Sequence, residues 1–169
     1  MNLTSRPAPR SRTVGPLPAE LVASATFLLK RLGYAAKEQS LEAYERTGLH
    51  PYHYAILLVL GERSHETQGA IADALGYDRG ALVGLLDELE ERGLVERRRD
   101  PTDRRRHLVE LTADGQQMLS RLRKLSRQIE DEFLAPLSDE ERVNLHALLL
   151  RLAEKHEPRC APVPTATAD

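Results

Sequence analysis

The chain has 169 residues, a length that suits one compact domain with its own core. Its 41% hydrophobic and 30% charged residues exclude a wholly disordered chain, and the longest apolar run, residues 55–60, is too short to span a membrane. The formal net charge of −2 gives no global sign of a nucleic-acid partner, and the single cysteine, Cys160, excludes an internal disulfide. We expect a cytoplasmic protein.

The first half of the chain predicts an arm followed by two helices. Residues 1–17 are rich in proline, serine and arginine, which favours a flexible arm. A long helical pattern begins at Pro18 and continues to Gly48, with an apolar stripe at Leu21, Val22, Ala25, Leu28, Leu29 and Leu32. A second helix begins at Pro51 and is apolar on all sides, which predicts a buried, central helix.

Residues 68–87, QGAIADALGYDRGALVGLLD, match the spacing of a helix-turn-helix. Ala72 is small enough for two helices to cross closely, and Gly76 can adopt the left-handed backbone of a tight turn. We expect Thr67 and Asp78 to cap the two helices and the second, recognition helix to cover residues 78–92. The core beneath them should contain Ile71, Leu75, Leu82 and Leu85. A plain helical hairpin is the alternative.

Residues 94–111, LVERRRDPTDRRRHLVEL, predict a β-hairpin whose turn contains Asp100 and Asp103. Residues 92–106 hold seven arginines against three acidic residues, a basic patch of the kind that binds nucleic acid. For residues 97–99, pairing with nearby acids is an equal alternative to DNA contact. The position of Arg104 and Arg105 at the hairpin tip favours DNA.

The last third predicts two more helices and a tail. Thr112 precedes a helix with a narrow apolar seam at Met118, Leu122, Leu125, Ile129 and Phe133. Ser138 and Glu141 have the spacing of a capping box at the start of the final helix. These stripes exceed what a winged helix needs for its own core, so we expect a homodimer. The expected regions are dimerisation, 18–50 and 112–156; DNA binding, 51–111; and a flexible tail, 157–169.

Residues 100–106, DPTDRRR, followed by LTADG at 111–115, resemble the DPxDRR…LTxxG signature of the MarR family of transcriptional regulators. Residues 89–95 resemble that family's LExxGLV join between recognition helix and wing. The resemblance implies a mainly α (α+β) winged helix-turn-helix homodimer with six helices and a β-hairpin wing. It also implies a repressor that small phenolic or anionic aromatic ligands release from DNA, with Asp103 fixing the wing and Arg105 reaching the minor groove.

The recognition helix departs from the family's common Ser-Thr-x-x-Arg, because residues 80–84 read GALVG. We expect the two glycines to allow close approach to DNA, Val83 to touch a thymine methyl group and Arg79 to read guanine or a phosphate. The expected DNA contacts are Thr67 and Gln68 at the start of the motif, Asp78, Arg79, Gly80, Val83 and Gly84 on the recognition helix, and Arg97, Arg98, Asp103, Arg104, Arg105 and Arg106 on the wing.

A candidate effector pocket follows from the resemblance, where imidazole and phenol groups could orient an aromatic acid. Its candidate residues are Tyr34, His50, Tyr52 and His53. The alternative is that the two histidines only cap a helix. A regulator without a small-molecule effector, controlled by a metal, by pH or by a protein partner, also stays open.

Other chemistry has little support in the sequence. His50 and His53 have no adjacent carboxylate or thiol in a ligand pattern, so we expect no metal and no cofactor. We find no nucleophile elbow or glycine-rich phosphate loop, so we expect no enzyme. A winged helix that binds proteins instead of DNA would not need six arginines on its wing.

Overall fold

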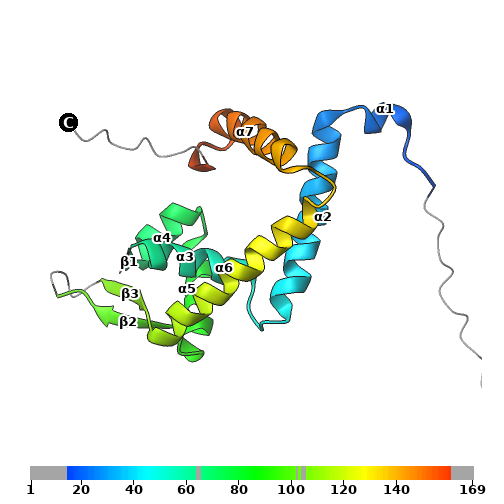
Figure 1. The fold of residues 1–169 in the computed structure, drawn as a ribbon. Helices are drawn as coiled ribbons and strands as arrows, with labels where there is room; N and C mark the ends of the chain where they lie inside the picture. Colours follow the sequence, from blue (N-terminus) through cyan, green and yellow to red (C-terminus); the bar gives the residue numbers. More distant parts are fainter. Residues whose placement is uncertain (1–14, 64–65, 102, 104–105, 161–169) are drawn as a thin grey trace, which may run out of the picture. The chain divides into compact units, whose positions relative to one another are not determined.

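The computed structural model describes residues 15–63, 66–101, 103 and 106–160. This part of the chain is mainly helical and carries one small antiparallel sheet (Figure 1). The helices are α1 (Ala19–Val22), α2 (Ala25–Glu45), α3 (Pro51–Glu62), α4 (Gln68–Leu75), α5 (Arg79–Glu91), α6 (Ala113–Phe133), α7 (Asp139–His156) and the 3-10 turn η1 (Pro158–Cys160). The strands are β1 (Glu66–Thr67), β2 (Val95–Arg99) and β3 (His107–Leu111). In these described ranges no helix has the length and apolar character that crossing a membrane demands.

The expected mainly α winged helix is confirmed, with seven α-helices among the described residues in place of the expected six. The additional helix arises because the first helical pattern is interrupted after Ala23. There the hydroxyl oxygen of Ser24 accepts a hydrogen bond from the Phe27 amide at 3.4 Å. A serine side chain that bonds nearby amides competes with continuous helix and starts a new one, so α2 begins at Ala25.

The chain divides into two units, of which the first ends at Lys37 and the second begins at Glu38. In the first unit the apolar stripe predicted from the sequence stays at the surface. Each of these side chains is at least 40% exposed: Leu21, Val22, Leu28, Leu29 and Leu32.

The core of the second unit forms around α3, as expected from its apolar sequence. Ile56, Leu57 and Leu60 are at most 2% exposed. The other fully buried members come from the helix-turn-helix, the hairpin and α6, namely Ile71, Leu82, Leu86, Leu89, Val95, Val109 and Leu122. Leu75 and Leu85, expected in this core, are partly buried and pack against it. The helix-turn-helix and the hairpin (residues 66–111), together called the reading head below, therefore share one hydrophobic core with α6.

The sheet has the strand order β1-β3-β2 and is antiparallel throughout. The hairpin pairs Val95 with Leu111 and Arg97 with Val109. Strand β1 was not predicted from the sequence. Its two residues have no periodic pattern of their own, and their partners in β3 lie about 40 residues further along the chain.

A joint between the hairpin and α6 gives the LTxxG element a physical reason. The Thr112 hydroxyl donates to the Gly93 carbonyl at 2.6 Å and accepts from the Gly115 amide at 3.0 Å. The Thr112 amide donates to the Leu94 carbonyl at 3.1 Å. A Cβ atom on Gly115 would collide with that same carbonyl oxygen. Both ends of the wing are thus tied to the first turn of α6.

Candidate nucleic-acid interface

The helix-turn-helix has the caps and the turn that its sequence predicts. The Thr67 hydroxyl accepts from the amide three residues further on at 3.1 Å. Gly76 has φ +65°, a left-handed conformation that glycine adopts without the strain of a side chain. Asp78 caps α5, because its Oδ1 accepts from the amides of Gly80 and Ala81 at 2.9 and 3.0 Å. These bonds fix the angle at which α5 leaves the turn.

Helix α5 has one buried face and one exposed stripe. The buried face consists of Leu82, Leu86 and Leu89. The exposed stripe consists of Arg79, Gly80, Val83, Gly84 and Asp87. Apart from the two charged ends, the stripe is apolar or lacks side chains, so it presents a flat helical surface that a nucleic-acid groove could accommodate.

The two glycines on this stripe have different neighbours. A Cβ atom on Gly84 would meet no heavy atom within 4 Å, whereas one on Gly80 would lie 3.1 Å from the capping oxygen of Asp78. Packing within the chain therefore does not require glycine at position 84. Arg79 is 78% exposed, and its Nη2 lies 3.9 Å from a carboxylate oxygen of Asp73. An exposed pair at that distance contributes little stability, so the guanidinium can exchange it for another anion.

A groove of about 500 Å³ joins the helix-turn-helix to the wing. It is lined by Thr67, Gln68, Gly69, Ala70, Asp73, Arg79, Arg106 and His107. Two arginines and one histidine reach it from α5, the wing and β3, and its wall contains the first turn of α4, where helix amides are directed outward. His107 was not predicted as a site residue from the sequence. The signal was available, because this residue directly follows the arginine run.

Asp100 and Asp103, predicted in the turn of the wing, both make hydrogen bonds or ion pairs within it. The Asp103 amide donates to Oδ1 of Asp100 at 3.4 Å, and the Asp100 amide donates to the Arg106 carbonyl at 3.0 Å. The Arg106 amide donates to the Asp103 carbonyl at 2.9 Å, and the Arg106 guanidinium lies 3.2 Å from the Asp103 carboxylate. Arg104 and Arg105, two predicted DNA contacts, lie outside the described residues.

Arg98 lies on the outer face of the hairpin, where strand alternation places it beside two glutamates. Its guanidinium is 2.6 Å from Glu96 and 2.8 Å from Glu110. The Arg98 side chain remains 65% exposed, so solvent weakens both ion pairs. A contact with DNA would require the guanidinium to rearrange.

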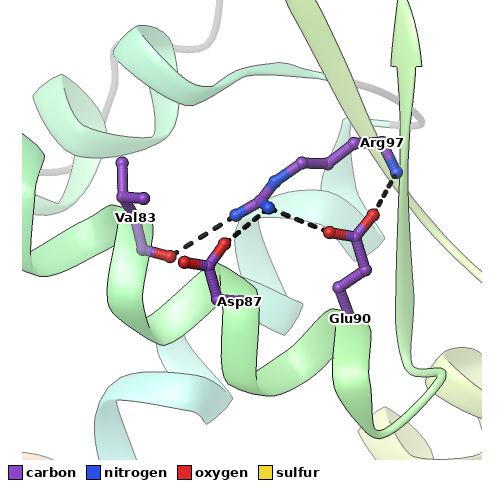
Figure 2. Close-up of polar contacts among 4 residues, drawn as sticks. All are labelled: Val83, Asp87, Glu90 and Arg97. Atoms are coloured by element: carbon purple, nitrogen blue, oxygen red, sulfur yellow. Dashed lines mark hydrogen bonds and ion pairs between the residues drawn. The ribbon is translucent and has the colours of Figure 1, made fainter.

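Arg97 points the other way, toward α5 (Figure 2). Its Nη1 lies 2.6 Å from Asp87 and 2.9 Å from Glu90, and its Nη2 donates to the Val83 carbonyl at 3.4 Å. The reason is strand alternation, since Arg97 shares a face with the buried Val95. Internal pairing, one of the two alternatives that the sequence left open, is therefore what the structure shows for this arginine. The pairing argues against the predicted DNA contact.

The two candidate ligand-binding histidines cap α3. The His50 Nδ1 accepts from the Tyr52 amide at 3.3 Å, and the His53 Nδ1 accepts from the His50 amide at 3.1 Å. This places the proton of neutral His53 on Nε2, which lies 3.3 Å from the Glu88 carboxylate but forms no hydrogen bond with any described residue. Burial lowers the pKa of His53; Glu88 opposes this effect, and Arg92 and His50 add to it.

Two tyrosines lie beside the start of the recognition helix. The rings of Tyr52 and Tyr77 are 5.4 Å apart, and a shallow hollow of about 260 Å³ lies next to them. Its lining is Tyr52, Gly76, Tyr77, Asp78, Ala81 and Leu85.

Tyr34, the remaining ligand candidate, lies in the first unit and is 59% exposed. Within the described residues, no group of three or more histidine, cysteine or acidic side chains is placed to bind a metal.

Comparison with known proteins agrees with this geometry. The sequence profile of the MarR family matches residues 47–106. A protein of Thauera aromatica assigned as a transcriptional regulatory protein for the hcr operon is 38% identical over 127 residues, 75% of this chain and 76% of the relative.

Solved structures show the same fold. The transcriptional repressor CouR, bound to a 23-mer DNA duplex, is 34% identical with a TM-score of 0.73 and covers 82% of this chain and 99% of its own. The PcaV regulator of Streptomyces coelicolor, in complex with its natural ligand, is 27% identical with a TM-score of 0.66 and covers 84% of this chain and 100% of its own. The relatives and the fold are those of regulators and not of enzymes. The chain therefore belongs to the MarR family of transcriptional regulators.

Proposed function

We propose that this regulator binds duplex DNA sequence-specifically as a homodimer, represses transcription and is released by a small aromatic or anionic ligand. The observation that carries the DNA-binding part is the exposed stripe of α5, which lies beside a groove lined by Arg79, Arg106 and His107. The structure of the relative CouR on a DNA duplex supports the same mode of binding.

In this proposal α5 enters the major groove. Gly80 and Gly84 let the helix backbone approach the bases, Val83 touches a thymine methyl group and Arg79 reads guanine or a phosphate. Asp78 keeps the helix start in place by capping it. A phosphate would fit the groove beside α4, near the first-turn amides of Gln68 and Gly69.

The wing supplies the second group of contacts. We propose that Asp103 fixes the turn, that Arg105 enters the minor groove and that Arg104, Arg106 and Arg98 contact phosphates. Arginine suits a narrow minor groove, where the negative potential is strongest. The ion pair between Arg106 and Asp103 supports this role of the aspartate.

A second copy of the chain is the proposed partner for the exposed apolar side chains outside the reading head. In the second unit these are Val143, Leu148, Leu149 and Leu152, each at least 40% exposed. The stripe in the first unit is similar in character. A twofold dimer would present two reading heads to half-sites about one helical turn apart. The 23-mer duplex bound by CouR is about two turns long, which is sufficient for such a site.

An effector is proposed because PcaV has been solved with its natural ligand. The proposed contacts are His50, Tyr52 and His53, of which Tyr52 borders the hollow beside the recognition helix. A specific observation also favours the second candidate, regulation by pH. The buried His53 lies 3.3 Å from Glu88, which belongs to the recognition helix.

Selection of duplexes from a random-sequence pool tests the DNA-binding proposal. The full chain should enrich a pseudo-palindromic sequence, and the affinity for a labelled copy should fall log-linearly with salt. Arg79→Ala should cost about 1–3 kcal/mol if the arginine makes a bidentate base contact, and Arg105→Ala should cost more. Arg46→Ala is the matched control, because Arg46 is 76% exposed and pairs only with Glu42 of α2 among the described residues. Failure to enrich any sequence would refute the proposal.

The effector proposal has its own test. A thermal-shift screen of aromatic acids, metals and metabolites identifies ligands, and each hit is then added to the complex with DNA. A true effector weakens DNA binding, and DNA weakens effector binding by the same factor. Stabilising ligands that leave the DNA complex intact would contradict this part of the proposal.

A further inference from the structure

Arg97 occupies an unusual position for an arginine in a basic wing. Its side chain is 18% exposed, and the hydrogen bonds of this side chain within the described residues all go to α5. Glu90 holds it twice, because one carboxylate oxygen accepts from the Arg97 amide at 3.2 Å and the other from Nη1 at 2.9 Å. Glu90 of α5 thus holds both the main chain and the side chain of Arg97 (Figure 2).

The same contacts also partly neutralise the negative charge of Asp87 and Glu90 on the recognition helix. Asp87 ends the exposed stripe one turn after Val83 and is 50% exposed, while Glu90 is 39% exposed. Unpaired carboxylates at these positions would face the phosphates of a bound duplex and repel them across less than a Debye length. Arg97 lies within ion-pair distance of both carboxylates and offsets part of this charge.

We propose that Arg97 is a positioning residue and not a DNA contact. It fixes the root of the wing against α5 and neutralises Asp87 and Glu90, so that the recognition helix can approach a polyanion. The inference rests on the proposed DNA-binding function. Its two terminal nitrogens donate to carboxylates and to the Val83 carbonyl, and its Nε is buried with no hydrogen-bond partner among the described residues, so the guanidinium faces α5.

A double-mutant cycle separates this role from direct contact with a phosphate. Affinity for the selected duplex is measured for the full chain, Arg97→Met, Asp87→Asn with Glu90→Gln, and all three changes together. If Arg97 acts through the two carboxylates, Arg97→Met weakens binding about tenfold in the natural background and less than about twofold in the amide background. If Arg97 contacts a phosphate, the loss is equal in both backgrounds, and the inference is overturned.

The salt dependence gives a second, independent readout. The slope of log K against log salt is negative, and loss of one phosphate contact makes it shallower by about 0.9. Loss of a positioning residue leaves the slope in the amide background unchanged. A residue with only a structural role would change the free energy of unfolding in urea and leave the salt dependence of DNA binding unchanged in both backgrounds. Arg46→Met is the control for the loss of any one arginine, because Arg46 lies just after the end of α2 and is 76% exposed.

The outcomes also separate this inference from the proposed function. If the natural chain enriches no duplex, the proposed function fails, and the inference that rests on it fails with it. If it binds and the cycle is additive, only the role of Arg97 fails. Circular dichroism verifies that each variant is folded. Should Arg97→Met lose its helices, Arg97→Lys replaces it in the cycle, and a loss smaller than that expected for Met but still confined to the natural background supports the inference.

Discussion

Gly115 lies against the carbonyl oxygen of Leu94, and no space remains between them for a Cβ atom. Because that oxygen also accepts a hydrogen bond from the Thr112 amide, it cannot move away without breaking the joint between the wing and α6. Gly115→Ala should therefore destabilise the chain by about 1–3 kcal/mol despite the better helix propensity of alanine. Urea unfolding measures this change, and equal or greater stability would show that the joint relaxes easily.

Gly84→Ala provides the opposite case. A Cβ atom there meets no heavy atom within 4 Å, so the free protein should gain about 1 kcal/mol in its free energy of unfolding. If the recognition helix approaches DNA closely at this point, the same variant binds the selected duplex more weakly. Gly84→Arg should in addition alter the sequence preference, and unchanged preference in a repeated selection would exclude contact at this position.

The stability of the chain should depend on pH through His53. Burial lowers the folded-state pKa of this histidine below its ordinary value near 6.5, so the unfolded chain binds the proton more readily. The stabilising contribution is complete above pH 6.5 and is lost as the pH falls through the folded-state pKa. His53→Gln keeps an acceptor for the His50 amide and should remove this loss.

Urea unfolding of both proteins between pH 8 and 5 measures the difference, which cannot change by more than about 1.4 kcal/mol per pH unit for one proton. His146→Gln on the exposed surface of α7 is the control. Parallel curves for the natural chain and His53→Gln would show that His53 does not titrate differently in the folded state.

A substitution on α7 tests the proposed dimer. Leu152 is 46% exposed in the single chain, and a glutamate there would place a charge in the proposed apolar contact. Leu152→Glu should therefore lower the mass measured by sedimentation equilibrium from two chains to one, whereas Lys155→Glu on the same helix should not. A natural chain that sediments as a monomer at micromolar concentration would contradict the prediction.

Helix ends were the features that the sequence predicted best, because capping depends on residues three positions apart. Thr67, Asp78 and the reciprocal pair of Ser138 and Glu141 all cap as expected. The interruption at Ser24 depends on the same kind of bond, but good helix formers on both sides of it concealed the signal.

Features that depend on distant parts of the chain could not be predicted in the same way. Strand alternation places Arg97 inward, but its partners, Asp87 and Glu90, follow from how α5 packs on the hairpin. Likewise His50 and His53 are separated by the spacing of a capping box, yet their residue type suggested a ligand site. A side chain with several chemical uses shows which one it serves only once its neighbours are known.

The position of β2 in the sheet gives its arginines a further consequence. In the described sheet β2 pairs with β3 on one side, so its other side is an edge at which another copy could add a strand. Charged side chains on such an edge oppose aggregation. Replacing Arg98 or Arg99 with an apolar residue would remove that protection and could be mistaken for a loss of DNA binding. Glutamine is therefore the appropriate substitution at these outer positions, whereas the inward Arg97 can accept methionine.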